Sequence, residues 1–124
     1  MMDQPSMREL VEAVRDFIEQ RAMTELKGHT AFHARVAANA LSIVARELEK
    51  SGPSGAAERE RLQSLLGHDG TLLQLNRELC RELRGGGIDL DTKGLAEHLT
   101  LTTLDKVAID QPNYSGLKRL LADS

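Results

Sequence analysis

Apolar residues recur at three- and four-residue spacing along most of the chain, which is the period of an amphipathic helix. In the first such run Leu10, Val14 and Phe17 follow Ser6, and Glu9 lies three residues after that serine in the pattern of a capping box. Alternation of apolar and polar residues, which would indicate strands, persists nowhere, and only the stretch HLTLTT is ambiguous. The pattern predicts an all-α, single-domain antiparallel bundle of about five helices.

Start and stop signals set the expected helix boundaries. Residues 51–55, which include Gly52 and Pro53, are expected to end the longest helix, and residues 85–87 to form a flexible connector. Asp91 can cap the fifth helix, and the last residues are expected to form one more turn or to fray. The predicted helices, in one domain covering residues 1–124, span residues 6–21, 30–51, 56–66, 71–84 and 91–110.

The expected core collects the apolar positions that share a helix face: Leu10, Val14, Phe17, Val36, Ala40, Val44, Leu75, Leu79 and Leu99. Small residues on such a face let a neighbouring helix approach closely, so Ala40 is predicted to lie at a tight crossing. Cys80, next to Leu79 on a leucine-rich helix, is expected to be a small buried hydrophobe.

The stretch GHTAFHARVAANALSIVAREL carries the strongest candidates for a functional site. An advance of about 100° per residue places His33 near the centre of the apolar face of this helix. On the opposite face the same arithmetic aligns a polar stripe of Arg35, Asn39, Ser42 and Arg46. Such a stripe can present a guanidinium fork and an amide to an anion or a carboxylate, or it can be a solvated face.

His33 has three interpretations, namely a core histidine bonded to a backbone group, a general base, or a metal ligand together with His29. The segment between the two histidines lacks the glutamate of the His-Glu-x-x-His motif. A catalytic zinc would also need a third ligand from His68, His98, Cys80 or a carboxylate. The structural interpretation of His33 is preferred, and no catalytic residue, metal or cofactor is predicted.

Composition narrows the classes of partner. The formal charge is −3 and aromatic residues make up only 2% of the chain, so neither a cationic surface nor a stacking platform for nucleic acid is expected. No apolar run approaches the length of a membrane span. A single cysteine and the absence of a recognisable leader favour a cytoplasmic protein.

The stretches FHARVAANALSIVAREL, LNRELCRELRGGGIDLD and HLTLTTLDKVAIDQPNYS resemble a bacterial family of small helical domains of unknown function. The resemblance covers about half of the chain. It implies a helical domain found beside or fused to aminoglycoside-phosphotransferase-like kinases, often near acyl-CoA dehydrogenases. It brings no catalytic residue that can be transferred onto this sequence.

The expected function is that of a non-catalytic accessory or protein-interaction domain acting with such a kinase-like protein. Association of identical chains is also expected, since helix faces left apolar by a small bundle can pair isologously. The alternative is a small ligand-binding sensor or enzyme that uses the polar stripe and His33.

Overall fold

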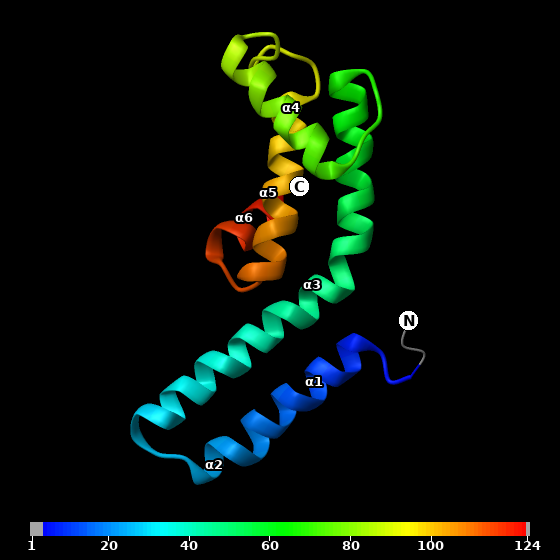
Figure 1. Cartoon of the computed structure of the whole chain (residues 1–124). Helices are drawn as coiled ribbons and strands as arrows, with labels where there is room; N and C mark the ends of the chain where they lie inside the picture. The colour runs from blue at the N-terminus through cyan, green and yellow to red at the C-terminus, as the bar shows by residue number, and fades with distance from the viewer. Residues whose placement is uncertain (1–3, 124) are drawn as a thin grey trace. The chain divides into compact units, whose positions relative to one another are not determined.

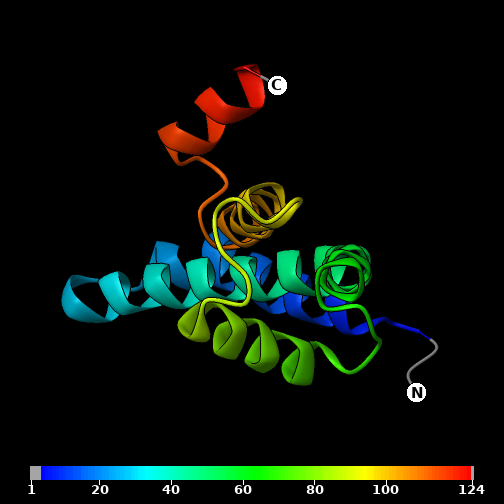
Figure 2. The same cartoon turned by 90° about the horizontal axis from the view of Figure 1, so that it is seen from above.

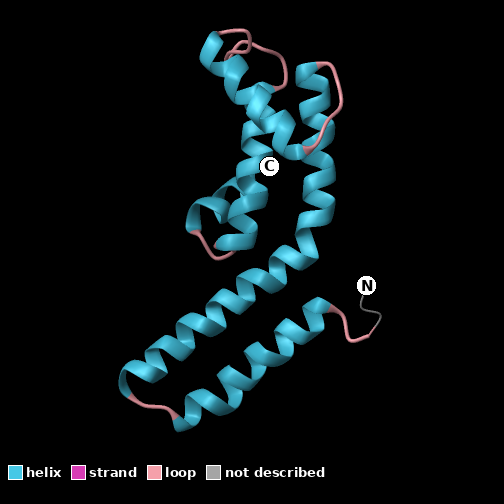
Figure 3. Ribbon diagram, viewed as in Figure 1, coloured by secondary structure: helices cyan, strands magenta, loops and turns pink. Residues whose placement is uncertain are grey.

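The structure is a computed structural model that describes residues 4–123, and every regular element in that range is helical (Figures 1 and 3). The elements are α1 (Met7–Phe17), the π-helix η1 (Ile18–Ala22), α2 (Met23–Glu25), α3 (Gly28–Leu66), α4 (Leu72–Gly85), α5 (Leu95–Asp110) and α6 (Ser115–Asp123). The ambiguous stretch HLTLTT lies within α5. The predicted all-α fold is confirmed.

Backbone contacts divide the chain into two compact units, unit 1 (Met1–Ser51) and unit 2 (Gly52–Ser124). The predicted break at residues 51–55 is wrong, because α3 runs through them and joins the two expected helices into one. Pro53 has no N–H to donate and lies between Gly52 and Gly55, which are weak helix formers, so the continuity of α3 rests on the stronger helix-forming runs before residue 51 and after residue 55. The prediction of one domain stays a prediction, since α3 contributes to both units.

Unit 1 is a helical hairpin. The predicted capping box at its start is confirmed: Ser6 Oγ accepts a hydrogen bond from the N–H of Glu9 at 3.1 Å, and Glu9 Oε1 accepts one from the N–H of Ser6 at 3.2 Å. Helical backbone then continues through η1 and α2, four residues beyond the expected end at residue 21. The chain reverses at Leu26 and Gly28, and α1 lies antiparallel beside the first part of α3 (Figures 1 and 2).

Alanines are the most buried residues of the hairpin. Ala38 is 1% exposed and Ala45 is 5% exposed, and no other described residue of unit 1 is fully buried. The two residues are seven positions apart on α3 and therefore share a face. Small side chains at a helix contact allow the axes to come close. We refer to Ala38 and Ala45 as the alanine seam.

Unit 2 has the larger core. It is built from the end of α3, from α4, from the connector that follows α4 and from the start of α5, and its buried members are Leu62, Leu75, Leu79, Ile88 and Leu95. The predicted burial of Leu75 and Leu79 is confirmed, whereas Leu99 is 41% exposed and its predicted burial is wrong. The buried side of α5 carries Leu95 and His98 instead of Leu99.

The connector between α4 and α5 is a structured turn. Gly86 ends α4 with a φ of 83°, a left-handed conformation that glycine adopts without steric cost. Asp89 then accepts a hydrogen bond from the N–H of Asp91 at 2.9 Å. This local bond competes with helix formation, so α5 begins at Leu95 with Gly94 as its N-cap. The prediction that Asp91 caps the fifth helix is therefore wrong.

Candidate functional site

Large apolar side chains lie exposed on unit 1. On α1 they are spaced three and four residues apart, and on α3 they are spaced in multiples of four. They are Met7, Leu10, Val14, Phe17, Phe32, Val36, Val44 and Leu48. Exposure ranges from 37% for Leu48 to 61% for Phe17. Five of them belong to the predicted core, namely Leu10, Val14, Phe17, Val36 and Val44.

The predicted burial is thus wrong for Leu10, Val14, Phe17, Val36, Ala40 and Val44, all of which are exposed. The physical reason is the alanine seam. Ala38 faces α1, and Val36 lies about 200° round the helix from it. Because alanines bring the helices closest, Val36 and Val44 are turned away from α1, and Ala40 does not lie at the crossing.

The exposed apolar residues fall on two sides of the hairpin. The alanine seam faces α1, and each residue advances about 100° round the helix. This advance places Val44 and Leu48 on the side of the hairpin that also carries the exposed apolar residues of α1. We call this side the hairpin face, and it consists of Met7, Leu10, Val14, Phe17, Val44 and Leu48. Phe32 and Val36 lie farther round α3, on the side away from α1.

The predicted polar stripe keeps its geometry. Arg35 and Asn39 are exposed, and Ser42 and Arg46 are half-buried. All four lie on the side of α3 opposite to the hairpin face. Their role in binding stays a prediction.

His33 does not lie in a core. It is exposed, and its ring makes an edge contact with Phe32 at a centroid distance of 5.6 Å and an interplanar angle of 71°. The interpretation of His33 as a buried structural histidine is wrong, because the apolar face that it shares with Val36 is itself exposed.

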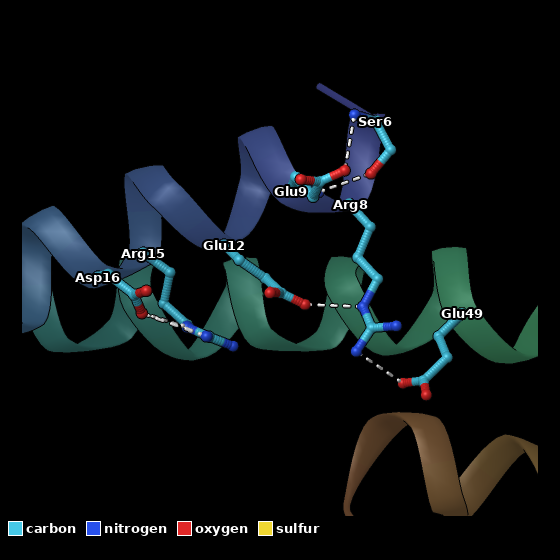
Figure 4. Close-up of polar contacts among 7 residues, drawn as sticks. All are labelled: Ser6, Arg8, Glu9, Glu12, Arg15, Asp16 and Glu49. Atoms are coloured by element: carbon cyan, nitrogen blue, oxygen red, sulfur yellow. Dashed lines mark hydrogen bonds and ion pairs between the residues drawn. The ribbon is translucent and has the colours of Figure 1, made fainter. Parts of the chain in front are cut away.

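Charged pairs lie along α1 and between α1 and α3, as Figure 4 shows. Arg8 Nε donates to Glu12 at 2.7 Å, and the same guanidinium reaches Glu49 of α3 at 3.5 Å. Both carboxylates raise the pKa of Arg8, with the hydrogen bond to Glu12 as the largest cause. These partners lie on the side of α1 away from Val14. The hairpin therefore has an apolar face and a charged face.

A second group of side chains meets inside unit 2. Arg61 Nε donates a 3.0 Å hydrogen bond to Nδ1 of His98, and Arg61 Nη2 donates to the Thr102 hydroxyl at 3.1 Å. Burial, followed by the charge of Arg61, lowers the pKa of His98. As Nδ1 accepts a hydrogen bond, His98 is the neutral tautomer with its proton on Nε2. Sequence patterns could not show this contact, because 37 residues separate Arg61 from His98.

The loop between α3 and α4 is held by paired charges. Arg59 bonds both carboxylate oxygens of Asp69, at 2.9 and 2.8 Å, and hydrogen bonds from Gln63 and then Arg59 lower the pKa of Asp69. His68 Nε2 lies 2.7 Å from a carboxylate oxygen of Glu78, which raises the pKa of the imidazole. Each side chain already has a partner within the chain, so the group acts as a clamp on the loop.

Cys80 is exposed, so its predicted burial is wrong. The buried side of α4 carries Leu75 and Leu79, and Cys80 lies about 100° round the helix from Leu79. A shallow hollow surrounds the thiol, and it is lined by Asn76, Arg77, Cys80, Arg81 and Arg84. All five residues belong to one helix face.

Within residues 4–123 no group of three or more histidine, cysteine or acidic side chains is close enough to hold a metal ion. His29 and His33 are both exposed on α3. In the same part of the chain, no buried side-chain nitrogen or oxygen lacks a hydrogen-bond partner. None of the helices described is both long enough and apolar enough to cross a bilayer.

Fold and surface together define a small all-α protein with an amphipathic hairpin. The chain belongs to the family described as Domain of unknown function (DUF6285), whose sequence model matches residues 24–114. The matched range contains all of α3, α4 and α5, while α1 and η1 precede it. No curated protein and no solved structure matches the chain.

Proposed function

We propose that this chain is a non-catalytic accessory domain that binds a protein partner through the outer surface of α3. We define this outer surface by Phe32, Arg35, Val36 and Asn39, which lie within about 100° of one another round the helix. The observation that carries the proposal is the exposure of Phe32, which is 59% exposed beside the exposed Arg35 and Asn39.

The chemistry of this surface fits protein recognition. Aromatic and arginine side chains are enriched where protein interfaces derive most of their binding energy. Phe32 can enter an apolar pocket of a partner, while the Arg35 fork and the Asn39 amide bond carboxylate and backbone groups around it. All four residues are exposed, so a partner can reach them without opening the hairpin.

The partner that we propose is an aminoglycoside-phosphotransferase-like kinase, on the strength of the sequence resemblance. Phosphoryl transfer would then belong to the partner. The complex would form in the cytoplasm, where the exposed thiol of Cys80 stays reduced.

Titration calorimetry of the purified kinase-like protein with the full chain tests this proposal. We expect Phe32→Ala and Arg35→Ala each to weaken binding by about 10-fold or more, since each truncates an interface anchor. Thr30→Ala is the matched control, because Thr30 is also exposed on α3 but lies outside the outer surface. Thermal unfolding should be nearly unchanged in all three variants.

Two outcomes would overturn the proposal. One is no binding by the unmodified chain with both proteins at about 100 µM, a concentration that detects even weak association. The other is equal affinity for the unmodified chain, Phe32→Ala and Arg35→Ala.

A further inference from the structure

The hairpin face is apolar along the whole length of α1. Met7, Leu10, Val14 and Phe17 are each between 43% and 61% exposed, and Val44 and Leu48 extend the surface onto α3. No member of this face is charged. The six side chains together expose several hundred Å² of apolar surface, which approaches the about 800 Å² that each partner contributes to a standard interface.

The hairpin itself buries little. Its fully buried side chains among the described residues are the two alanines of the seam. Fully burying a large aliphatic or aromatic side chain contributes about 1.5–3 kcal/mol, and on the hairpin face half of that contribution is unrealised. Two helices joined by a short turn are marginal without a further apolar partner. A partner that must always be present is most simply a second copy of the same chain.

The spacing of the α1 stripe suits its own copy. When two α1 helices pair antiparallel about a twofold axis at the level of Glu12, position 7 of one helix lies opposite position 17 of the other. Position 10 then lies opposite position 14. Met7 thus meets Phe17 and Leu10 meets Val14, so each apolar side chain has an apolar neighbour. Since the face lacks charge, the copy brings no like-charge repulsion.

We propose that the hairpin face is a homodimer interface. Two hairpins pack face to face as an isologous four-helix bundle, to which each chain contributes α1 and the first part of α3. The outer surface of α3 lies on a different side of the hairpin and is left accessible. This dimer is independent of the partner binding proposed above.

Light scattering coupled to gel filtration tests the dimer with the full chain alone. The expected mass is twice the 13.6 kDa of one chain. Val14→Lys places a charge at the centre of the face in both copies, and we expect it to raise the dimer dissociation constant about 100-fold or more. Leu73→Lys is the matched control, because it places the same charge at an exposed apolar residue of α4, outside the hairpin. The control should remain dimeric.

Thermal unfolding at several protein concentrations provides a second measurement that does not depend on whether Val14→Lys folds. Linkage of folding to association makes the midpoint rise with concentration for the unmodified chain and for Leu73→Lys. An unmodified chain that stays at 13.6 kDa at about 100 µM overturns the dimer, and so does a dimer whose dissociation constant is equal for Val14→Lys and Leu73→Lys. The dimer is tested with the chain alone, whereas partner binding is tested by comparing Phe32→Ala with the unmodified chain. Failure of one proposal therefore does not imply failure of the other.

Discussion

His98, which is 2% exposed, receives a hydrogen bond on Nδ1 from the Arg61 guanidinium 37 residues earlier in the chain. The bond requires a neutral imidazole, because a protonated Nδ1 cannot accept it. Protonation would also place a second positive charge beside Arg61 inside unit 2. Both effects agree with a lowered pKa for His98 in the folded protein.

The contribution of His98 to stability should therefore fall in mild acid. With a folded-state pKa below the ordinary 6.5, the unfolded chain binds the proton first as pH decreases. This contribution is fully present above pH 6.5 and is lost progressively down to the lowered pKa of His98. His98→Gln, whose amide oxygen can still accept from Arg61, should flatten this part of the profile. Urea denaturation between pH 7.5 and pH 5 measures the effect, and equal pH profiles for the two proteins would contradict it.

Ala38→Leu should destabilise the protein by about 1–3 kcal/mol, because the extra volume has no room in the alanine seam. Ala40→Leu, which adds the same volume at an exposed position two residues later, should change stability by less than about 0.5 kcal/mol. Denaturant unfolding of the two variants at one protein concentration distinguishes the positions. A larger loss for Ala40→Leu would mean that the helices cross at Ala40 after all.

Leu75→Ala should cost about 2–5 kcal/mol, since Leu75 is fully buried in the core of unit 2 and its truncation leaves a cavity. Leu73→Ala makes the same chemical change on α4 at a residue that is 61% exposed, and it should be close to neutral. Chemical denaturation followed by circular dichroism compares the two variants. Equal losses would count against the assignment of the core.

Ser6→Ala should destabilise α1 by about 0.5–2 kcal/mol, because it removes the oxygen that accepts a hydrogen bond from the Glu9 N–H. Ser64→Ala is the comparison. The hydroxyl of Ser64 donates to the Glu60 carbonyl within α3, and alanine is the better helix former there. Thermal melts should show a lower midpoint for Ser6→Ala alone, and matching melts would show that the cap contributes nothing.

Sequence patterns within a few residues determined much of the secondary structure of this protein. Helical periodicity predicted an all-α chain, and the capping box at Ser6 and Glu9 forms as expected because both partners lie within one turn. The burial of Leu75 and Leu79 follows from a single apolar stripe on α4. These features depend on residues a few positions apart, which the sequence displays directly.

Tertiary structure decided which apolar face of the hairpin is covered. Periodicity separates an apolar side of α3 from a polar one, but it does not show that α1 packs against Ala38 and Ala45 instead of Val36 and Val44. The close approach allowed by two alanines outweighs the larger apolar area of the valines, and Phe17 and Val14 stay exposed as a result. The contact of Arg61 with His98 likewise arises only when α3 and α5 meet, since no short-range pattern links residues 37 positions apart.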